Sequence, residues 1–346
     1  MSELTSVDRV GYIWISDIHV NSTNVTTMDR EKRSARAITD IANRADIDFV
    51  CVGGDLLNGT SNLTVACKLI NDWLEPLKDC KKPIIFLMGN HDDNAYGSSA
   101  FPKSTALWLL PRRSEFYNNI QFGDSENGYF YFDIHKKHTR VVCLNSCDYP
   151  SNKSAKSWWS LSEQQVKWFA TQAVNTSYNI IILSHMCPDK KYNFWNLGDE
   201  GGYHTDLINI ISTYNNRGSI SLYNTVYNYE TAQGKITFIH AGHTHLEPVE
   251  TPIVGGIPCV ITSCAKAWEQ APPSYFEAVE GMDNVYRIPD DKLAESHFNS
   301  NNYIFYHWAD RTLDTINEAL FDVVSATPSV INTIRIGSGL DRQFNL

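Results

Sequence analysis

The chain has 346 residues, enough for one large α/β domain, and its 42% hydrophobic and 20% charged residues exclude a disordered chain. Its 29 Lys and Arg against 39 Asp and Glu give a net charge of −10, which argues against a long non-specific nucleic-acid groove. No apolar run approaches the roughly 18 residues of a membrane span, and the first residues lack a signal-peptide pattern. Eight scattered cysteines without a Cys-x-x-Cys pair indicate reduced thiols, so we expect a cytoplasmic protein without a membrane partner.

Apolar strands and amphipathic helices alternate at the start of the chain. Strands are predicted at residues 10–16, 48–52 and 83–88, and helices at residues 29–45 and 63–77. This alternation predicts parallel pairing with right-handed crossovers. The carboxyl ends of such strands lie along one edge of the sheet, where ligands usually bind. Each of the three strands ends in polar residues.

The rest of the chain continues the α/β pattern with longer connections. A hairpin is predicted from residues 129–134 and 140–145, a helix at 161–173 and buried strands at 179–184, 235–239 and 256–262. Residues 186–233 look irregular, with one helix near 206–214. Residues 265–300 read as a connection, followed by β-like runs at 303–308, 320–324 and 330–336. We therefore expect a single domain over residues 1–346, in which residues 265–346 are a connection plus strands that complete a second sheet.

Five polar clusters each follow a predicted core strand. They are Asp17-x-His19, Gly54-Asp55, Gly89-Asn90-His91-Asp92, His185 and Gly242-His243-x-His245. One such cluster alone is typical of a polar turn after a strand, but five in one chain indicate a site. Their carboxylate, imidazole and amide groups suit Mn²⁺, Fe or Zn²⁺ and not a thiolate site. The glycines before Asp55, Asn90 and His243 are expected to let the backbone turn sharply.

In this order, over residues 17–245, the motifs resemble those of the calcineurin-like metallophosphoesterase superfamily. The resemblance implies a four-layer α/β/β/α sandwich with two mixed β-sheets and two divalent metal ions, expected to be Mn²⁺, with Fe or Zn²⁺ as alternatives. It also implies a metal-bridging hydroxide as nucleophile. One ion would be held by Asp17, His19, Asp55 and His245, and the other by Asp55, Asn90, His185 and His243. His91 would contact the phosphate and protonate the leaving oxygen, and Asp92 would orient His91.

Two departures from the pattern narrow the expected substrates. Residues 54–59 lack the Asp-Arg-Gly of the Ser/Thr protein phosphatases, and Asp92 stands where those enzymes have Glu. The resemblance therefore favours the phosphodiesterase and nuclease-like branch, and the tail at residues 335–342 resembles a bacterial and phage-encoded group. We expect hydrolysis of phosphate esters, chiefly diesters, in a small molecule or a nucleotide or nucleic acid. The alternatives are a phosphomonoesterase or protein phosphatase, and a structural or binding protein that keeps the fold within an assembly.

Other polar residues have weaker grounds for a role. Arg112 and Arg113 could bind a substrate phosphate, although an adjacent basic pair is typical of a solvated turn. His204 could reach the cleft, but a position at a helix N-terminus is the favoured interpretation. His240 is expected to be a structural histidine on a core strand. Substrate selection is expected to depend on the loops at residues 93–128, 146–160, 186–233 and 265–300.

Overall fold

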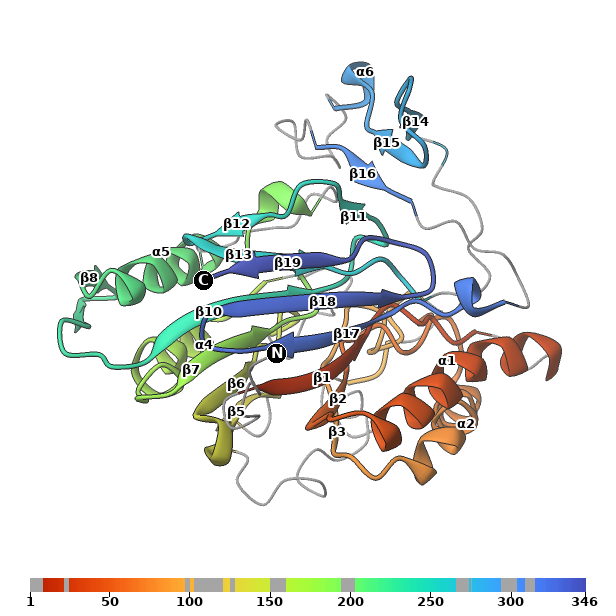
Figure 1. Cartoon of the computed structure of the whole chain (residues 1–346), viewed down its shortest axis with the longest axis horizontal. Helices are drawn as coiled ribbons and strands as arrows, with labels where there is room; N and C mark the ends of the chain where they lie inside the picture. The colour runs from red at the N-terminus through yellow and green to blue at the C-terminus, as the bar shows by residue number, and fades with distance from the viewer. Residues whose placement is uncertain are drawn as a thin grey trace, which may run out of the picture.

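Two β-sheets lie face to face, and helices cover the outer face of each sheet (Figure 1). The structure is a computed structural model. It describes residues 9–21, 25–96, 100–102, 121–124, 128–149, 160–193, 203–265, 274, 276–293, 304–308 and 315–346. All eight cysteines lie within these ranges as free thiols.

The first sheet has six strands in the order β19-β18-β17-β1-β2-β3. Its N-terminal strands run parallel to one another, as predicted. They are β1 (Val10–Ile15), β2 (Phe49–Val52) and β3 (Ile84–Phe86). The C-terminal strands pair antiparallel, with β17 directly against β1. They are β17 (Phe321–Ala326), β18 (Val330–Ile336) and β19 (Arg342–Asn345).

The second sheet has seven strands in the order β12-β13-β10-β7-β6-β5-β4. Strands β6, β7, β10 and β13 run parallel in its centre, and antiparallel strands lie on both sides. The strands are β4 (Gln121–Asp124), β5 (Tyr129–Ile134), β6 (Thr139–Cys143), β7 (Asn179–Leu183), β10 (Lys235–Ala241), β12 (Ile253–Val254) and β13 (Ile257–Ile261). The predicted hairpin is confirmed as β5 and β6.

Helices α1 (Val25–Arg44) and α2 (Leu63–Leu74) pack on the first sheet. Helix α4 (Glu163–Trp168) continues as a π-helix over Phe169–Ala173 and packs with α5 (Tyr203–Asn215) on the second sheet. Helix α2 was expected to reach residue 77, but the α-helix ends at Leu74. Pro76 has no N–H for the α-helical ladder, and the chain continues as a 3-10 helix over Glu75–Asp79. No helix among the described residues is long and apolar enough to cross a membrane.

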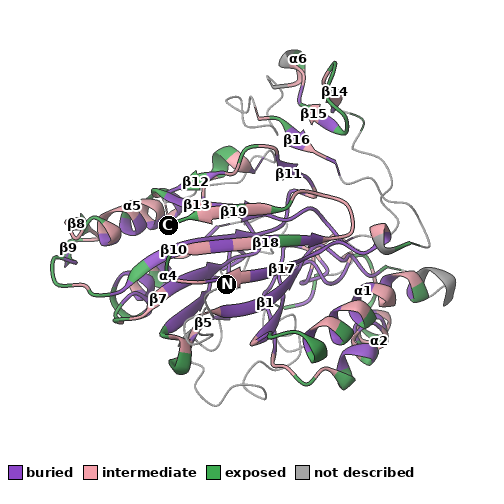
Figure 2. Ribbon diagram, in the orientation of Figure 1, coloured by how far each residue is buried: buried purple, intermediate pink, exposed green. Residues whose placement is uncertain are grey.

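Strand β1 shows how the four layers form. Ile13 and Ile15 pack toward α1 and α2, whereas Tyr12 and Trp14 pack toward the second sheet. All four side chains are buried, so this strand has no wet face (Figure 2). Strand β7 alternates in the same way between the helices and the first sheet. The predicted α/β/β/α sandwich with two mixed sheets is confirmed.

The expectation that the C-terminal strands complete a second sheet is wrong. Strands β17 and β18 extend the first sheet, because β17 pairs with the free edge of β1. Residues 304–308, the described part of the predicted run at 303–308, join neither large sheet. They contribute β16 (Tyr306–His307) to a small sheet with β11 (Glu247–Pro248), β14 (Glu277–Ala278) and β15 (Val285–Arg287). The assignment of the whole chain to one domain stays a prediction.

Two segments expected to lack strands contain them. Within residues 186–233, β8 (Ser219–Leu222) and β9 (Thr225–Asn228) form a hairpin. Its turn places Tyr223 and Asn224 at φ 54° and 59°, and a tyrosine in this conformation is not a recognisable turn signal. Within residues 265–300, β14 and β15 precede the short helix α6 (Asp290–Leu293). Apolar residues of the small sheet pack into a cluster of their own.

Candidate metal centre

Polar residues follow five strands at the edge where both large sheets end: β1, β2 and β3 in the first sheet, and β7 and β10 in the second. The structure brings these residues together. Imidazole Nδ1 of His185 lies 2.9 Å from the Gly53 carbonyl oxygen, which joins the end of β7 to the end of β2. The Gly242 N–H donates to the His185 carbonyl oxygen at 2.9 Å, which joins β10 to β7. The five clusters therefore form one site.

The backbone at this site is strained. Five of the predicted ligands have left-handed backbone angles: Asp17 (φ 56°), His19 (51°), Asp55 (51°), His243 (74°) and His245 (61°). Non-glycine residues in this region cost about 1–3 kcal/mol each, and they concentrate at functional sites. Backbone hydrogen bonds hold the conformation, since the Asp17 N–H donates to the Gly54 carbonyl oxygen (3.0 Å) and the His19 N–H to that of Asp55 (2.9 Å).

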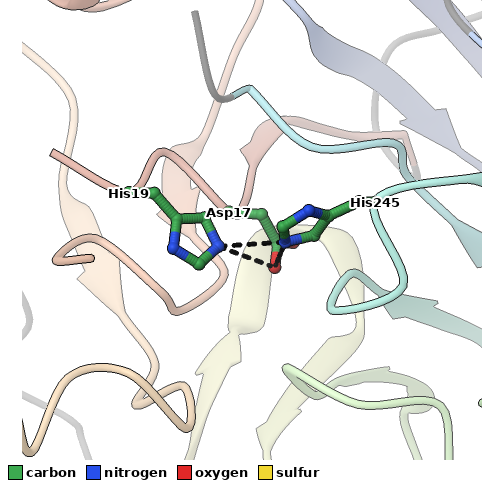
Figure 3. Close-up of side chains that lie close together, drawn as sticks. All are labelled: Asp17, His19 and His245. Carbon is green, nitrogen blue, oxygen red and sulfur yellow. Dashed lines mark hydrogen bonds and ion pairs between the residues drawn. The ribbon is translucent and has the colours of Figure 1, made fainter. Parts of the chain in front are cut away.

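Three candidate metal ligands lie together and form a first donor group, a cluster in which each side chain offers an atom that can bind a cation. They are Asp17, His19 and His245 (Figure 3). The Nε2 atoms of the two histidines lie 2.9 Å apart, and Asp17 Oδ1 lies 3.5 Å from His245 Nε2. Asp17 Oδ2 accepts a hydrogen bond from the His243 N–H at 2.8 Å. Asp17 Oδ1, by contrast, is buried and forms no hydrogen bond with any residue that the structure describes. This oxygen and the two imidazoles therefore share a position that suits a cation.

Asp55 lies between this group and a second one. Its Oδ1 accepts a hydrogen bond from the His91 N–H at 2.8 Å. Its Oδ2 lies 3.6 Å from His19 Nε2 and 3.4 Å from His185 Nε2. Donor atoms of Asp55, His185 and His243 lie within 4.8 Å of one another. Asp55 Oδ2 is therefore the oxygen that faces both groups.

The hydrogen bonds of His185 indicate what the second group requires. Since Nδ1 faces the Gly53 carbonyl oxygen, it carries a proton, and Nε2 of the neutral ring is an acceptor. Nε2 lies 3.1 Å from Asn90 Oδ1, which is also an acceptor. Two acceptors this close need either a proton on Nε2, which the raised pKa of His185 favours, or a metal ion between them. The donor set of both groups, with carboxylate, imidazole and amide oxygen, fits two divalent cations such as Mn²⁺, Fe or Zn²⁺.

Charge and burial oppose each other at this site. Burial disfavours the ionised form of Asp55, but His185, His91 and His19 outweigh it and hold the pKa of Asp55 well below its usual range. Burial would also lower the pKa of His185, but the Asp55 and Asp17 carboxylates raise that pKa to about 9. Burial lowers the pKa of His243 to about 3, with a further contribution from His185. His243 is therefore a neutral imidazole, the form that binds metals.

Three glycines make room for the ligands. Only Gly54 has a left-handed backbone angle, with φ 102°. At Gly89 a Cβ would lie 2.2 Å from Asp55 Oδ1, and at Gly242 it would lie 2.6 Å from Asp17 Oδ2. Gly89 and Gly242 each begin a turn, as predicted, because the Asp92 N–H donates to the Gly89 carbonyl oxygen at 3.3 Å and the Thr244 N–H to that of Gly242 at 2.9 Å. These two glycines allow a carboxylate to lie directly against the backbone.

The predicted contact between Asp92 and the ring of His91 is wrong. The carboxylate of Asp92 is buried and accepts hydrogen bonds from the backbone N–H groups of Gly89 (2.8 Å), Asp55 (2.9 Å) and Leu57 (3.1 Å). Three backbone N–H groups at the ends of two strands therefore occupy both carboxylate oxygens of Asp92. Asp92 therefore ties the end of β3 to the end of β2.

His91 is oriented by other groups. Its Nδ1 lies 2.8 Å from the Asn58 carbonyl oxygen, and its Nε2 lies 4.0 Å from Asp55 Oδ2. The ring of His19 meets it edge-on, with 4.5 Å between centroids, and the ring of Tyr96 stacks on it at 3.9 Å. The side chain of His91 is 20% exposed, whereas those of His19 and His185 are buried. Asn58 and Tyr96 carried no sequence signal, because one acts through its backbone and the other is an isolated aromatic residue in a loop.

The remaining candidates lie away from the donor groups. His240 is buried between the Tyr12 hydroxyl (3.0 Å), Thr262 Oγ1 (2.8 Å) and Asp322 Oδ2 (3.2 Å), so the prediction of a structural histidine is confirmed. His204 is buried in the first turn of α5, as favoured. Arg112 and Arg113 lie outside the described residues, as do parts of all four predicted substrate loops.

Comparison with known proteins gives a match over the same region. A family model described as calcineurin-like phosphoesterase matches residues 12–247, a range that contains every predicted ligand. A comparison with curated protein sequences found no match.

Solved structures share the fold. A dimetal phosphatase from Danio rerio is similar at a TM-score of 0.60 and 12% identity, over 97% of this chain and 98% of that chain. A purple acid phosphatase from yellow lupin (Lupinus luteus) seeds is similar at a TM-score of 0.50 and 12% identity, over 97% of this chain and 54% of that chain. At these identities the likeness concerns the fold alone.

Proposed function

Since the chain belongs to the calcineurin-like phosphoesterase family and is thereby a metal-dependent phosphoester hydrolase, we propose that it cleaves phosphodiesters at a pair of divalent ions. The observation that carries the proposal is the position of Asp55. One carboxylate oxygen, Oδ2, lies within 4.0 Å of Nε2 of His19, His185 and His91, while the other is occupied by the His91 N–H. A carboxylate with one oxygen shared between two donor groups is suited to bridge two cations.

The chain's own residues divide into two ligand sets. Asp17, His19 and His245 would hold one ion, and Asn90, His185 and His243 the other, with Asp55 Oδ2 common to both. When bound, such a pair activates a water molecule as nucleophile and neutralises charge on the phosphate. We favour Mn²⁺ because carboxylate and amide oxygens accompany the imidazoles, and Fe or Zn²⁺ are the alternatives.

His91 has the position of a proton donor. Its Nδ1 donates to the Asn58 carbonyl oxygen, so Nε2 is the nitrogen that faces the donor groups. In the protonated ring both nitrogens donate. Burial lowers the pKa of His91, and the Asp55 carboxylate and the Asn58 carbonyl oxygen offset only part of that effect. The partial exposure of His91 gives substrate access to it. His91 would then protonate the leaving oxygen of the ester.

The charges around the site favour a diester. Asp17 and Asp55 form ion pairs only with histidines among the described residues, and no Lys or Arg pairs with either. A diester carries one negative charge, whereas a phosphomonoester carries close to two at neutral pH and needs more cationic neighbours. The diester can belong to a small molecule, a nucleotide or a nucleic acid.

Phosphomonoester hydrolysis is the second candidate. The observation in its favour is that both reported structural neighbours are phosphatases by name. Their 12% identity to this chain leaves the substrate open.

Turnover assays separate the two candidates. Protein loaded with Mn²⁺, Zn²⁺ or Fe²⁺ is assayed with bis-p-nitrophenyl phosphate, p-nitrophenyl phosphate and a phosphoserine peptide, with Asp55→Asn as the control for contaminating phosphatases. We expect the highest kcat/KM for the diester with Mn²⁺. A higher kcat/KM for either monoester would assign the protein to the second candidate or to the protein phosphatases. No turnover with any substrate and metal would favour a binding protein that keeps the fold.

A further inference from the structure

Tyr96 lies against two residues of the third polar cluster, Asn90 and His91. Asn90 Nδ2 donates a hydrogen bond to the Tyr96 hydroxyl, with 3.1 Å between the two atoms. The phenol ring stacks on the His91 imidazole, with 3.9 Å between centroids and 6° between planes. The chain returns to this position because Asn94 has a φ of 61° and its N–H donates to the His91 carbonyl oxygen at 3.0 Å. One side chain thus contacts a candidate metal ligand and the candidate acid.

The hydroxyl of Tyr96 lies on the Nδ2 side of the Asn90 amide, and the amide oxygen faces the second donor group. An asparagine side chain offers one oxygen and one NH₂ group, and only the oxygen binds a cation. Because Nδ2 donates a hydrogen bond to the Tyr96 hydroxyl, Oδ1 is turned toward His185 and lies 3.1 Å from its Nε2. Without the hydroxyl, no described residue would accept a hydrogen bond from Nδ2, and the amide could rotate and turn its NH₂ group toward the cation.

The ring of Tyr96 acts on His91 in a different way. The Asn58 carbonyl oxygen fixes one edge of the imidazole, and the ring of His19 meets it at 81°. The ring of Tyr96 lies parallel to the imidazole of His91. It restrains the imidazole from tilting, so that Nε2 stays directed at the donor groups.

We propose that Tyr96 is a positioning residue with two separable contacts, a hydroxyl that orients the Asn90 amide for metal binding and a ring that orients His91. The second contact matters to the reaction only if the proposed function holds. The first contact concerns metal binding alone, and it stands or falls without any substrate.

The variant Tyr96→Phe tests the hydroxyl. It keeps the ring and removes the acceptor of the Asn90 hydrogen bond. Titration with Mn²⁺, followed by electron paramagnetic resonance without substrate, is expected to show one of two ions bound about 10- to 100-fold more weakly, as for other partners of metal ligands. The matched control is Tyr229→Phe, which loses a hydroxyl bonded at 3.0 Å to the Ala170 carbonyl oxygen on α4 and its π-helical extension. Its Mn²⁺ binding should equal that of the wild type.

The variant Tyr96→Leu tests the ring by comparison with Tyr96→Phe. With saturating Mn²⁺, we expect a further rate loss of about 2- to 10-fold for phenyl phosphodiesters, whose leaving group needs a proton. The further loss should be smaller for p-nitrophenyl phosphodiesters, whose leaving group departs without one. Ring resonances of His91 in the NMR spectrum, assigned with His91→Asn, should shift in Tyr96→Leu and stay near the wild-type position in Tyr96→Phe.

Each contact has an outcome that overturns it. Wild-type Mn²⁺ affinity in Tyr96→Phe would show that the hydroxyl does not orient Asn90. An equal rate loss for both leaving groups, or unchanged His91 resonances in Tyr96→Leu, would show that the ring does not orient His91. If the wild type hydrolyses no phosphate ester, the proposed function fails, while the Mn²⁺ titration and the NMR comparison still decide on Tyr96.

Discussion

Replacement of Arg335 by methionine is expected to lower the melting temperature by about 4 °C. Arg335 lies on β18 directly opposite Asp322 on β17. Its guanidinium group donates to Asp322 Oδ1 (2.5 Å) and to Glu247 Oε2 (2.9 Å). All three side chains are at most 2% exposed. Methionine would fill similar space but would leave two buried carboxylates without their cation.

The size of the effect follows from what remains around the two carboxylates. Breaking a buried ion pair by removing one partner costs about 3–5 kcal/mol. The lower end applies here, because Asp322 keeps its bond from Thr262 Oγ1 (2.6 Å) and Glu247 keeps the Leu340 N–H (2.9 Å). An unfolding entropy of about 2.1 cal/mol/K per residue, applied to 346 residues, amounts to about 0.7 kcal/mol/K. A loss of about 3 kcal/mol therefore corresponds to about 4 °C.

Thermal unfolding of the metal-free protein measures this directly. The control is Arg9→Met, which breaks an ion pair with Asp46 whose two side chains are 36% and 53% exposed. That variant is expected to lose less than about 1 kcal/mol. Adding Asp322→Asn and Glu247→Gln to Arg335→Met should restore part of the stability, since the uncompensated charges are then gone. Equal melting temperatures for Arg335→Met and Arg9→Met would refute the reasoning.

Four further outcomes are expected. Asp55→Asn should lose both metal ions and turnover in elemental analysis and assays after Mn²⁺ loading; a wild type that binds no more than one ion would count against the shared carboxylate. His91→Asn should keep both ions and lose rate by about 10²–10⁴-fold on poor leaving groups, and loss of metal would contradict its role as acid. Gly89→Ala should abolish Mn²⁺ binding in a titration, because its Cβ would lie 2.2 Å from Asp55 Oδ1, whereas Gly218→Ala, with its nearest contact at 3.3 Å, should bind normally. Burial raises the pKa of Glu31 from 4.5 to about 8. The stability that this carboxyl contributes below pH 4.5 is therefore lost as the pH rises through about 8. Glu31→Gln should flatten the fall in melting temperature over that range.

The centre of the fold could be predicted because its signals are local. Short apolar runs such as residues 83–88 and 179–184 are too apolar to have a wet face, and each is followed at once by polar residues. Alternation with helices implies parallel strands, and parallel strands place their carboxyl ends on one edge. The position of the donor groups at the ends of β1, β2, β3, β7 and β10 follows from these three steps.

The partners of the C-terminal strands could not be predicted in this way. Buried and less buried residues alternate only in part along β17. Such alternation indicates which face of a strand is buried, but it does not indicate which strand pairs with it. Val10 pairs with Ala326, more than 300 residues further along the chain. The pairing of β17 with β18 places Asp322 opposite Arg335, which also donates to Glu247. These ion pairs between distant parts of the chain form only once the sheets are assembled.

The role that the resemblance implies for Asp92 does not fit the geometry of this chain. The resemblance implies that Asp92 orients His91, its neighbour in the sequence. Successive side chains in a turn leave in different directions, and Asp92 turns back to the N–H groups of Gly89, Asp55 and Leu57. The carboxylate satisfies backbone donors that a sharp chain reversal leaves unpaired. A carboxylate that follows a candidate catalytic residue can therefore bind backbone N–H groups and not the neighbouring side chain, and only the geometry distinguishes these two roles.

The backbone angles at the ligands depend on contacts that no local pattern contains. Asp and His enter the left-handed region more readily than most residues, yet nothing beside Asp17 or His245 in the sequence predicts it. The conformation of Asp17 is held from elsewhere, because its N–H donates to Gly54 at the end of β2 and its Oδ2 accepts from His243 beyond β10. Each such residue costs about 1–3 kcal/mol, a cost that only the assembled sheets can offset. The motifs therefore identify the donors, whereas their common direction is a property of the two sheets together.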